Sequence, residues 1–320
     1  MRAILFDEPG DAGVLRAGEA PSPTCGPNEI RISVRATAVN RADLLQRAGR
    51  YPPPPGASSL LGLECAGVVS EAGAQVQGWS TGDRAMALLS GGGYAEETVV
   101  DAGSAMHVPD ALSDEEAAAL PETFLTAFLN IFLLGHLRAD ETVLIHGGGS
   151  GVGTAAIILC RLAGARVIVT AGSSEKCARC LELGADVAIN YREEDFVERA
   201  HGANVILDHL GASYLPRDLE ALAVDGRIIV IGSMGGERNA SLDVVKLLGK
   251  RASIIGSTLR SRSNEEKASL VAAFLAHFGS DLEAGRIRPL IHQVFPLENA
   301  ADAHRLMESS THFGKIVLRV

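Results

Sequence analysis

The sequence contains no dense cluster of Lys and Arg, no long apolar run and no framework of cysteines. Its 39 acidic residues outnumber the 29 basic ones, which favours solubility and makes nucleic acid an unexpected partner. No apolar run approaches the roughly 18–20 residues that a membrane-spanning helix needs. The first residues, MRAILFDEPG, reach an acid early and lack the apolar core of a secretion signal. We therefore expect no membrane insertion and no signal peptide.

The few cysteines predict a reduced, cytoplasmic setting, because five of them in 320 residues form no disulfide framework. Cys177 and Cys180 form a C-x-x-C within SSEKCARCLELGA, a helical pattern that places both on one face. A metal pair would need two further ligands at suitable spacing, and none lies nearby. We expect both thiols to be structural.

The chain length predicts two domains at roughly 100–200 residues each. Residues 1–120 contain short β-like runs separated by Gly, Pro and Asp, which is typical of a β-rich, partly barrel-like unit. From about residue 140 apolar runs alternate with helical patterns, which predicts a parallel sheet covered on both faces. The six apolar runs are 141–147, 165–172, 186–190, 203–211, 226–232 and 253–258.

The end of the chain resembles its beginning more than its middle. A long helical pattern, NEEKASLVAAFLAHFGSDLEAG, is followed by a strand, an amphipathic helix and the closing run GKIVLRV. We predict an α/β fold in which a doubly wound parallel-sheet domain, 121–282, is inserted into a β-rich domain formed by 1–120 and completed by 283–320.

The strongest motif is the glycine-rich turn in VLIHGGGSGVGTAA, between a buried run and a helix. Glycines allow backbone to approach a pyrophosphate, and the helix N-terminus offers free N–H groups to it. A strict G-x-G-x-x-G does not fit, because position 154 is Thr, but the strand before and the helix after support dinucleotide binding. The predicted contacts are Gly148, Ser150, Gly151, Val152 and Gly153.

The next strand indicates which dinucleotide is preferred. NAD sites carry an acid roughly 20 residues after the glycines, where it binds the ribose 2′-hydroxyl. Here that strand ends in Ala171-Gly172-Ser173-Ser174-Glu175-Lys176. No acid ends the strand, Lys176 is placed to pair with a 2′-phosphate, and either serine is able to donate to it. NADPH is therefore predicted over NADH, although Lys176 as a solvated helix residue is the alternative.

These features, read with NRADLLQRAGRYPPPPG, LGLECAGVV, LPETFLTAF, ILDHLG, IGSMGG and ENAADAHRLMESSTHFGKIVL, resemble the medium-chain dehydrogenase/reductase superfamily. Within it they are most similar to the zinc-free quinone oxidoreductases of the zeta-crystallin type, and STLRSRS (257–263) favours the stress-induced, NADPH-dependent branch. The resemblance runs from residue 38 to the C-terminus. It implies a Rossmann domain inserted into a GroES-like catalytic domain.

The resemblance also implies the absence of zinc. Zinc-dependent relatives carry Cys at the place of Asn40 and His at the place of Leu63, and they have a four-cysteine lobe that this chain lacks. Glu64 is retained, and we expect a structural role for it, with hydrogen bonds to backbone.

The resemblance implies a set of site residues. Asn40 and Asp43 would line the cleft near the nicotinamide, with Tyr51 on the substrate side; Asp43 as a helix cap and Tyr51 as a ring packed on the prolines are the alternatives. The remaining expected contacts of the cofactor are Thr126 at the nicotinamide end, Gly172, Ser173, Lys176 and Tyr191 around the 2′-phosphate, and Ile231, Gly232, Ser233, Met234, Thr258, Leu259 and Arg260 around the nicotinamide ribose.

The implied reaction is hydride transfer from NADPH to a quinone or a similarly electron-poor carbonyl compound. A quinone needs little activation because its reduction restores aromaticity, whereas alcohol oxidation benefits from a Lewis acid. We expect Asn40 to donate a hydrogen bond to the acceptor. Reduction of activated C=C bonds in enals, enones or enoyl thioesters is an alternative, as are a zinc alcohol dehydrogenase and a non-catalytic NADPH-binding, sensor or RNA-binding protein. No histidine is assigned a catalytic role.

Relatives form homodimers through an edge strand, and SIIGST (253–258) is a candidate for that edge. We therefore expect a homodimer.

Overall fold

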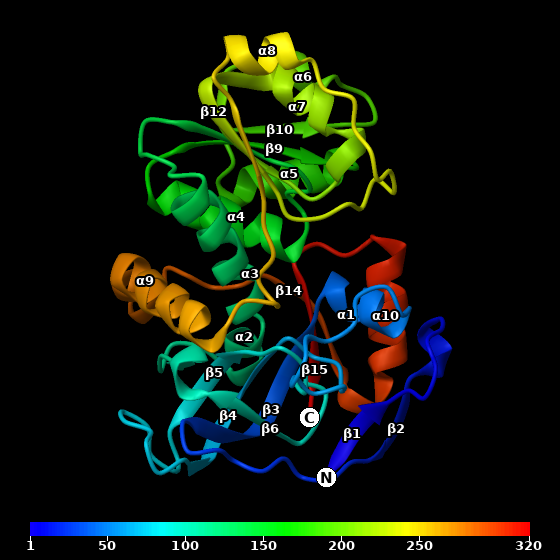
Figure 1. Cartoon of the computed structure of the whole chain (residues 1–320), viewed down its shortest axis with the longest axis vertical. Helices are drawn as coiled ribbons and strands as arrows, with labels where there is room; N and C mark the ends of the chain where they lie inside the picture. The colour runs from blue at the N-terminus through cyan, green and yellow to red at the C-terminus, as the bar shows by residue number, and fades with distance from the viewer. The chain divides into compact units, whose positions relative to one another are not determined.

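The computed structural model describes residues 1–320, and the chain divides into two compact units (Figure 1). Unit 1 comprises Met1–Leu125 and Leu259–Val320, and unit 2 comprises Thr126–Thr258. The blue and cyan beginning of the chain thus belongs to the same unit as its orange and red end (Figure 1). The predicted α/β fold, with one domain inserted into another, is confirmed.

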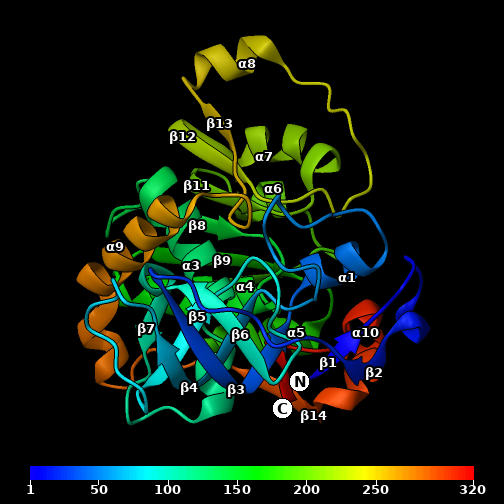
Figure 2. The same cartoon turned by 60° about the horizontal axis from the view of Figure 1, so that its bottom comes forward.

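Unit 1 is β-rich. A seven-stranded sheet has the order β14-β15-β3-β4-β5-β7, with β6 also paired to β3, and β1 and β2 form a separate antiparallel pair (Figure 2). The strands are β1 (Arg2–Leu5), β2 (Arg16–Glu19), β3 (Glu29–Val39), β4 (Glu64–Ala72), β5 (Arg84–Leu88), β6 (Glu97–Asp101), β7 (Ala105–His107), β14 (Ile291–Pro296) and β15 (Lys315–Arg319). The helices are η1 (Ala12–Val14), α1 (Arg41–Arg47), η2 (Ala102–Ser104), α2 (Asp114–Ala118), α9 (Asn264–Glu283), η5 (Leu297–Asn299) and α10 (Ala300–Ser309), and α3 (Pro121–Ala127) crosses the unit boundary.

Alternation along β3 builds the core of unit 1. Ile30, Ile32 and Val34 point to one face and join a buried cluster with residues of β4 and β5. The closing strand β15 lies between β14 and β3, with Ile316 opposite Val39 in an antiparallel register. Strands β14 and β15 therefore join the sheet that β3 begins, so a late part of the chain belongs to the same unit as its beginning.

Helix α9 belongs to unit 1, whereas the sequence placed 259–282 in the inserted domain. Its buried face packs on η2 and β7. A methyl group on Gly103 would lie 2.6 Å from the Cβ of Ala268, so the two backbones approach closely. The helical pattern showed which face is buried, but it carried no information about which sheet that face would meet.

Unit 2 is a doubly wound parallel sheet in the order β10-β9-β8-β11-β12-β13. Its strands are β8 (Thr142–Ile145), β9 (Arg166–Ala171), β10 (Val187–Asn190), β11 (Ala203–Asp208), β12 (Leu222–Val230) and β13 (Ser253–Gly256), so each predicted run overlaps a strand, although β12 starts four residues before its run. Its helices are η3 (Phe128–Leu134), a π-helix, α4 (Gly151–Leu162), α5 (Ser174–Leu183), α6 (Phe196–Arg199), η4 (Gly211–Ser213), α7 (Leu215–Ala221) and α8 (Val244–Gly249).

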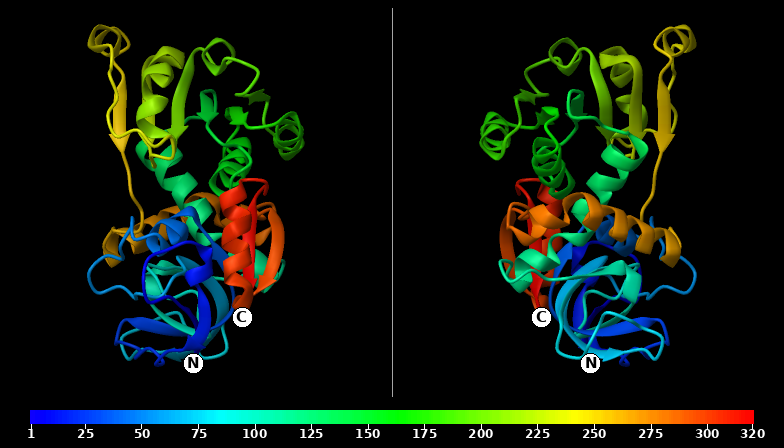
Figure 3. Two further views of the ribbon diagram at one scale, coloured as in Figure 1. Left: turned by 90° about the vertical axis from the view of Figure 1, so that its right-hand side faces the viewer. Right: turned by 90° about the vertical axis from the view of Figure 1, so that its left-hand side faces the viewer.

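Side-chain alternation gives the sheet of unit 2 two apolar faces. Leu144, Ile168, Ile206 and Ile228 form a buried cluster with the residues of α6 and α7. Helices α4 and α5 contact strands β8, β9 and β10. Strand β13, gold in Figure 3, has a neighbour on one side only and is an edge of the sheet.

Candidate active site

The glycine-rich turn joins β8 to α4 and presents free backbone donors. Gly147 has a φ of 66°, which starts the turn. Ser150 caps α4, because its Oγ accepts the N–H of Gly153 at 3.0 Å. The N–H groups of Gly151 and Val152 have no acceptor within the chain. These two donors and the positive end of the helix dipole fit an anion such as the pyrophosphate of a dinucleotide.

The glycines of this turn are also required by packing. A Cβ on Gly153 would lie 2.3 Å from the carbonyl oxygen of Gly147, so α4 starts directly against the turn. A Cβ on Gly148 would lie 2.8 Å from Val169 and 3.0 Å from the Sγ of Cys180. The side chain of Cys180 thus packs against the glycine-rich turn at Gly148, so this cysteine of the C-x-x-C has a packing role.

The four residues predicted to surround a 2′-phosphate are brought together after β9. The Oγ of Ser173 caps α5 and accepts the N–H of Lys176 at 3.2 Å. A Cβ on Gly172 would lie 2.8 Å from the hydroxyl of Tyr191, so this ring lies over the turn. Burial lowers the pKa of Lys176, whose side chain is partly enclosed. The group offers a cation, a hydroxyl and no acid at the strand end.

The other cofactor contacts predicted for unit 2 follow β12 and β13. The N–H of Ile231 donates to the backbone carbonyl of Asp208 at 2.7 Å, and the N–H of Met234 donates to the backbone carbonyl of His209 at 3.0 Å. These bonds join the turns that follow β11 and β12. Gly232, Ser233 and Thr258 also follow these strand ends, where parallel sheets bind ligands. Their contacts with a cofactor stay predictions, as does that of Thr126.

Asn40 is held in a buried network of unit 1 (its side chain is 8% exposed). Its Nδ2 donates to Glu64 Oε1 at 2.8 Å and to the Ala38 carbonyl at 3.3 Å, and its Oδ1 accepts from Lys315 Nζ at 2.7 Å. Lys315 also donates to Glu64 Oε1 at 2.7 Å. Both amide N–H groups of Asn40 are therefore occupied. A hydrogen bond from Asn40 to an acceptor would require one of these bonds to be given up, and its contact with an acceptor stays a prediction.

Asp43 is fully buried and belongs to the start of α1. One carboxylate oxygen accepts the N–H of Asn40 at 2.7 Å, as in a capping box, and the other accepts the N–H of Gly62 at 3.0 Å. Burial raises the pKa of Asp43 to about 6. This geometry corresponds to the cap that the sequence left as an alternative, and a contact of Asp43 near the nicotinamide stays a prediction.

His304 of α10 is also bonded within unit 1. The Nε2 of His304 lies 3.1 Å from the Tyr94 hydroxyl and its Nδ1 lies 3.2 Å from Arg47. Burial, with a smaller contribution from Arg47, lowers the pKa of His304 to about 3, so the ring is neutral at physiological pH.

Tyr51 differs from Asn40 and Asp43, because its side chain is only partly buried and its hydroxyl makes no hydrogen bond within the chain. The guanidinium of Arg260 lies over its ring, 5.4 Å from the centroid. Arg260 also donates to Gln46 Oε1 at 2.6 Å and to the Ser90 carbonyl at 2.9 Å. These bonds lie within unit 1, as does the buried side chain of Leu259, and contacts of both residues with a cofactor stay predictions.

Three residues that contact these side chains were not predicted from the sequence: Lys315 and Glu122, which bind Glu64, and Lys267, which binds Arg260. The backbone N–H of Glu122 donates to Glu64 Oε2 at 2.9 Å, so the expected backbone bond of Glu64 exists. Lys267 is 3% exposed and donates to Ser90 Oγ and to the Arg260 carbonyl. The motif LPETFLTAF contains Glu122, but an acid in the first turn of a helix is common and does not by itself indicate a site.

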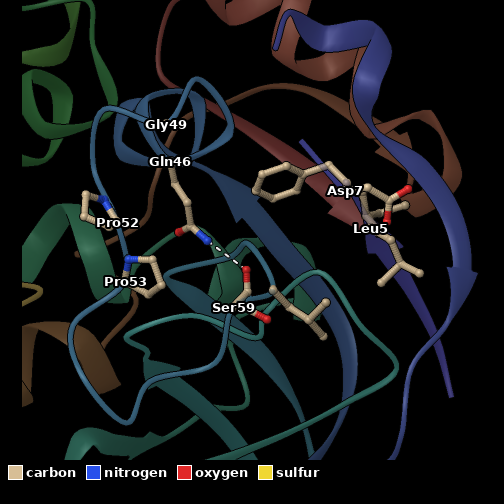
Figure 4. Close-up of a pocket in the computed structure, with 10 residues that line it drawn as sticks. Leu5, Asp7, Gln46, Gly49, Pro52, Pro53 and Ser59 are labelled. Carbon is tan, nitrogen blue, oxygen red and sulfur yellow. Dashed lines mark hydrogen bonds between the residues drawn. The ribbon is translucent and has the colours of Figure 1, made fainter. Parts of the chain in front are cut away.

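A separate pocket of about 390 Å³ opens in unit 1 between β1 and the loop after α1 (Figure 4). The Nε2 of Gln46 donates across its wall to the Ser59 carbonyl at 2.9 Å (Figure 4). The lining is mainly apolar and consists of Ile4, Leu5, Phe6, Asp7, Gln46, Gly49, Pro52, Pro53, Ser59 and Leu60. None of the three predicted catalytic residues lines this pocket.

No group of three or more His, Cys, Asp and Glu side chains is placed to hold a metal ion. None of the helices is both long and apolar enough to cross a membrane.

Comparisons with known proteins agree with both units. Residues 26–110 match the alcohol dehydrogenase GroES-like domain family, and residues 151–276 match the zinc-binding dehydrogenase family. The chain is 32% identical over 327 residues to a quinone oxidoreductase of Rattus norvegicus, covering 99% of this chain and 97% of the relative.

Solved structures of the same fold carry different activities in their descriptions. An Escherichia coli quinone oxidoreductase complexed with NADPH is 29% identical, with a TM-score of 0.86 and full coverage of both chains. An NAD-dependent alcohol dehydrogenase is 34% identical, with a TM-score of 0.87 and full coverage of both. The CurK enoyl reductase is 29% identical, with a TM-score of 0.85 over 99% of this chain and 98% of the other. The chain belongs to the medium-chain dehydrogenase/reductase superfamily of oxidoreductases, and quinone oxidoreductases are among its full-length relatives.

Proposed function

We propose that this oxidoreductase uses NADPH to reduce quinones and similarly electron-poor carbonyl compounds. When bound, NADPH supplies a hydride from its nicotinamide. Gly151 and Val152 offer their free N–H groups to the pyrophosphate, and Lys176, with Ser173, offers a cation and a hydroxyl to the 2′-phosphate. The absence of an acid at the end of β9 is the observation that carries the preference for NADPH.

The choice of acceptor rests on the likeness to quinone oxidoreductases over the full chain and on Tyr51. Its hydroxyl is the one polar group among the three predicted catalytic side chains that is not already bonded within unit 1. A hydroxyl donor is sufficient for an acceptor whose reduction restores aromaticity. The likeness to an enoyl reductase supports reduction of activated C=C bonds as the second candidate function.

A kinetic screen tests this proposal. Initial rates with NADPH and NADH would be measured over ortho-quinones, para-quinones and enones. We expect quinone turnover and a kcat/KM at least about 10-fold higher with NADPH, since one charge-assisted hydrogen bond contributes about 1.5–3 kcal/mol. Turnover of enones alone would overturn the quinone assignment, and a preference for NADH would overturn the choice of cofactor. NADPH binding without turnover of any acceptor would favour a non-catalytic protein, and stoichiometric zinc would favour an alcohol dehydrogenase.

We also propose a homodimer formed through the free edge of β13. The preceding helix α8 exposes Val244, Val245 and Leu248, at 60%, 80% and 71%. Light scattering is expected to give the mass of a dimer for the wild-type protein and of a monomer for Val245→Asp. Leu181→Asp, at an exposed position of α5 in the same unit, is the matched control and is expected to remain dimeric. A monomeric wild-type protein would contradict the proposal.

A further inference from the structure

One buried polar atom in the cluster around Glu64 has no hydrogen-bond partner, and it is Oε2 of Glu122. The neighbouring polar groups of Asn40, Asp43 and Lys315 are all bonded to one another, to Glu64 or to backbone. An ionised carboxylate with an enclosed, unbonded oxygen is costly, whereas a neutral carboxyl group is tolerated far better. The geometry therefore favours the protonated form of Glu122.

The charges around Glu122 point the same way. The backbone N–H of Glu122 donates to the carboxylate of Glu64, so the two carboxyl groups are neighbours within unit 1. The single cation bonded to either of them, Lys315, is paired with Glu64 at 2.7 Å. Two acids with one directly bonded cation favour one neutral acid. Burial first, and then the charge of Glu64, raise the pKa of Glu122 to about 8.

The two other nearby cations, Lys267 and Arg260, donate their hydrogen bonds to groups other than Glu122. Lys267 donates to Ser90 and to the Arg260 carbonyl, and Arg260 donates to Gln46 and to the Ser90 carbonyl. Neither forms an ion pair with Glu122. The proton on Glu122 is therefore not displaced by a salt bridge within unit 1.

Glu122 is also near the hydroxyl that is free to meet an acceptor. Burial and the charge of Glu122 both raise the pKa of Tyr51, which means that the two groups interact electrostatically. Glu122 as a residue is partly exposed, although its Oε2 is enclosed. A partly exposed carboxyl group and a partly buried tyrosine that interact electrostatically place two potential donors in the same region of unit 1.

We propose that Glu122 is the proton donor to the acceptor and that Tyr51 binds the same acceptor oxygen through its hydroxyl. This inference rests on the proposed function. Reduction of a quinone by the hydride of NADPH leaves a negative charge on the acceptor oxygen. The O–H bond of Glu122 then breaks and an O–H bond forms on that oxygen, which gives the hydroquinone and leaves Glu122 as a carboxylate. Solvent returns the proton before the next turnover.

Single-turnover kinetics of Glu122→Gln with NADPH and a quinone test the proposal. At pH 7 we expect the rate constant of reduction to fall by about 100-fold or more, as for loss of a general acid. The wild-type rate should fall above about pH 8, where Glu122 ionises, and this fall should be absent in Glu122→Gln. Glu122→Asp should retain part of the rate and the fall. Glu283→Gln, the same change at an exposed position of α9, is the control and should behave as wild type.

A second measurement does not depend on turnover. Infrared difference spectra of the resting protein between pH 7 and pH 9.5 should show the carbonyl band of a protonated carboxyl group disappearing near pH 8. This change should be missing in Glu122→Gln and present in Glu283→Gln.

The outcomes separate the two proposals. Wild-type turnover of quinones with an unchanged rate in Glu122→Gln, or with no carboxyl band assignable to Glu122, overturns the donor role and leaves the proposed function standing. A wild-type protein that reduces no acceptor overturns both.

Discussion

Replacing Lys315 by Met is expected to destabilise unit 1 by about 3–5 kcal/mol, because the change leaves the carboxylate of Glu64 buried without its cation. Lys315 is 3% exposed and Glu64 is fully buried, so water cannot replace the lost partner. The single tryptophan, Trp79, lies in unit 1 and stacks on His107 with ring centroids 4.0 Å apart. Its fluorescence therefore reports unfolding of this unit. The urea midpoint should fall by about 2 M for a slope of about 2 kcal/mol/M.

Two further variants make this result interpretable. Arg305→Met removes the cation of an exposed pair on α10, where both side chains are more than half exposed, and should cost less than about 1 kcal/mol. The double variant Glu64→Leu with Lys315→Met also removes the buried, unpaired carboxylate of Glu64. It should therefore be more stable than Lys315→Met alone. Equal midpoints for Lys315→Met and Arg305→Met would show that the buried pair does not stabilise unit 1.

The second large effect is expected from Gly153→Ala. The new methyl group would lie 2.3 Å from the carbonyl oxygen of Gly147, so the start of α4 must move away from the turn. That movement displaces the free N–H groups of Gly151 and Val152. Losing two charge-assisted hydrogen bonds, at about 1.5–3 kcal/mol each, predicts NADPH binding weaker by about 100-fold or more. Titration of NADPH fluorescence measures the affinity.

Gly279→Ala is the matched control for this substitution. Gly279 lies inside α9, and a Cβ there would meet only Leu275, at 3.9 Å. The change should leave NADPH affinity unaltered and slightly stabilise unit 1, since Ala favours a helix interior over Gly by about 0.5–1 kcal/mol. NADPH affinity in Gly153→Ala within about 3-fold of wild type, on the order of 0.7 kcal/mol, would contradict the role assigned to this turn.

The features predicted well from the sequence are those that a short segment determines alone. Six apolar runs gave the six strands of unit 2, and a run followed by glycines gave the turn before α4. Asn40 was predicted to lie in the site, but the buried network that holds its side chain was not predicted. Its partners Glu64 and Lys315 are 24 and 275 residues away, and no local pattern reveals which distant side chains will share a buried site.

Glu122 illustrates the other limit of local reasoning. At the start of α3 it is an ordinary acid near a helix N-terminus. Only the fold brings it beside Glu64 and leaves Lys315 to pair with one of the two. The proposed protonation of Glu122 therefore depends on contacts made by the folded unit and is not indicated by the segment LPETFLTAF.

The position of β15 has a consequence for biosynthesis. On one edge of β3, β6 pairs with residues 29–33 and β15 pairs with residues 36–39, so the second of these segments has no partner on that edge until β15 has been translated. At about 5–20 residues per second, the ribosome needs roughly 15–55 s to travel from the end of β3 to Lys315. An open strand edge is an aggregation hazard during such an interval. We expect this segment of β3 to need protection, by a chaperone or by transient pairing, until β15 is available.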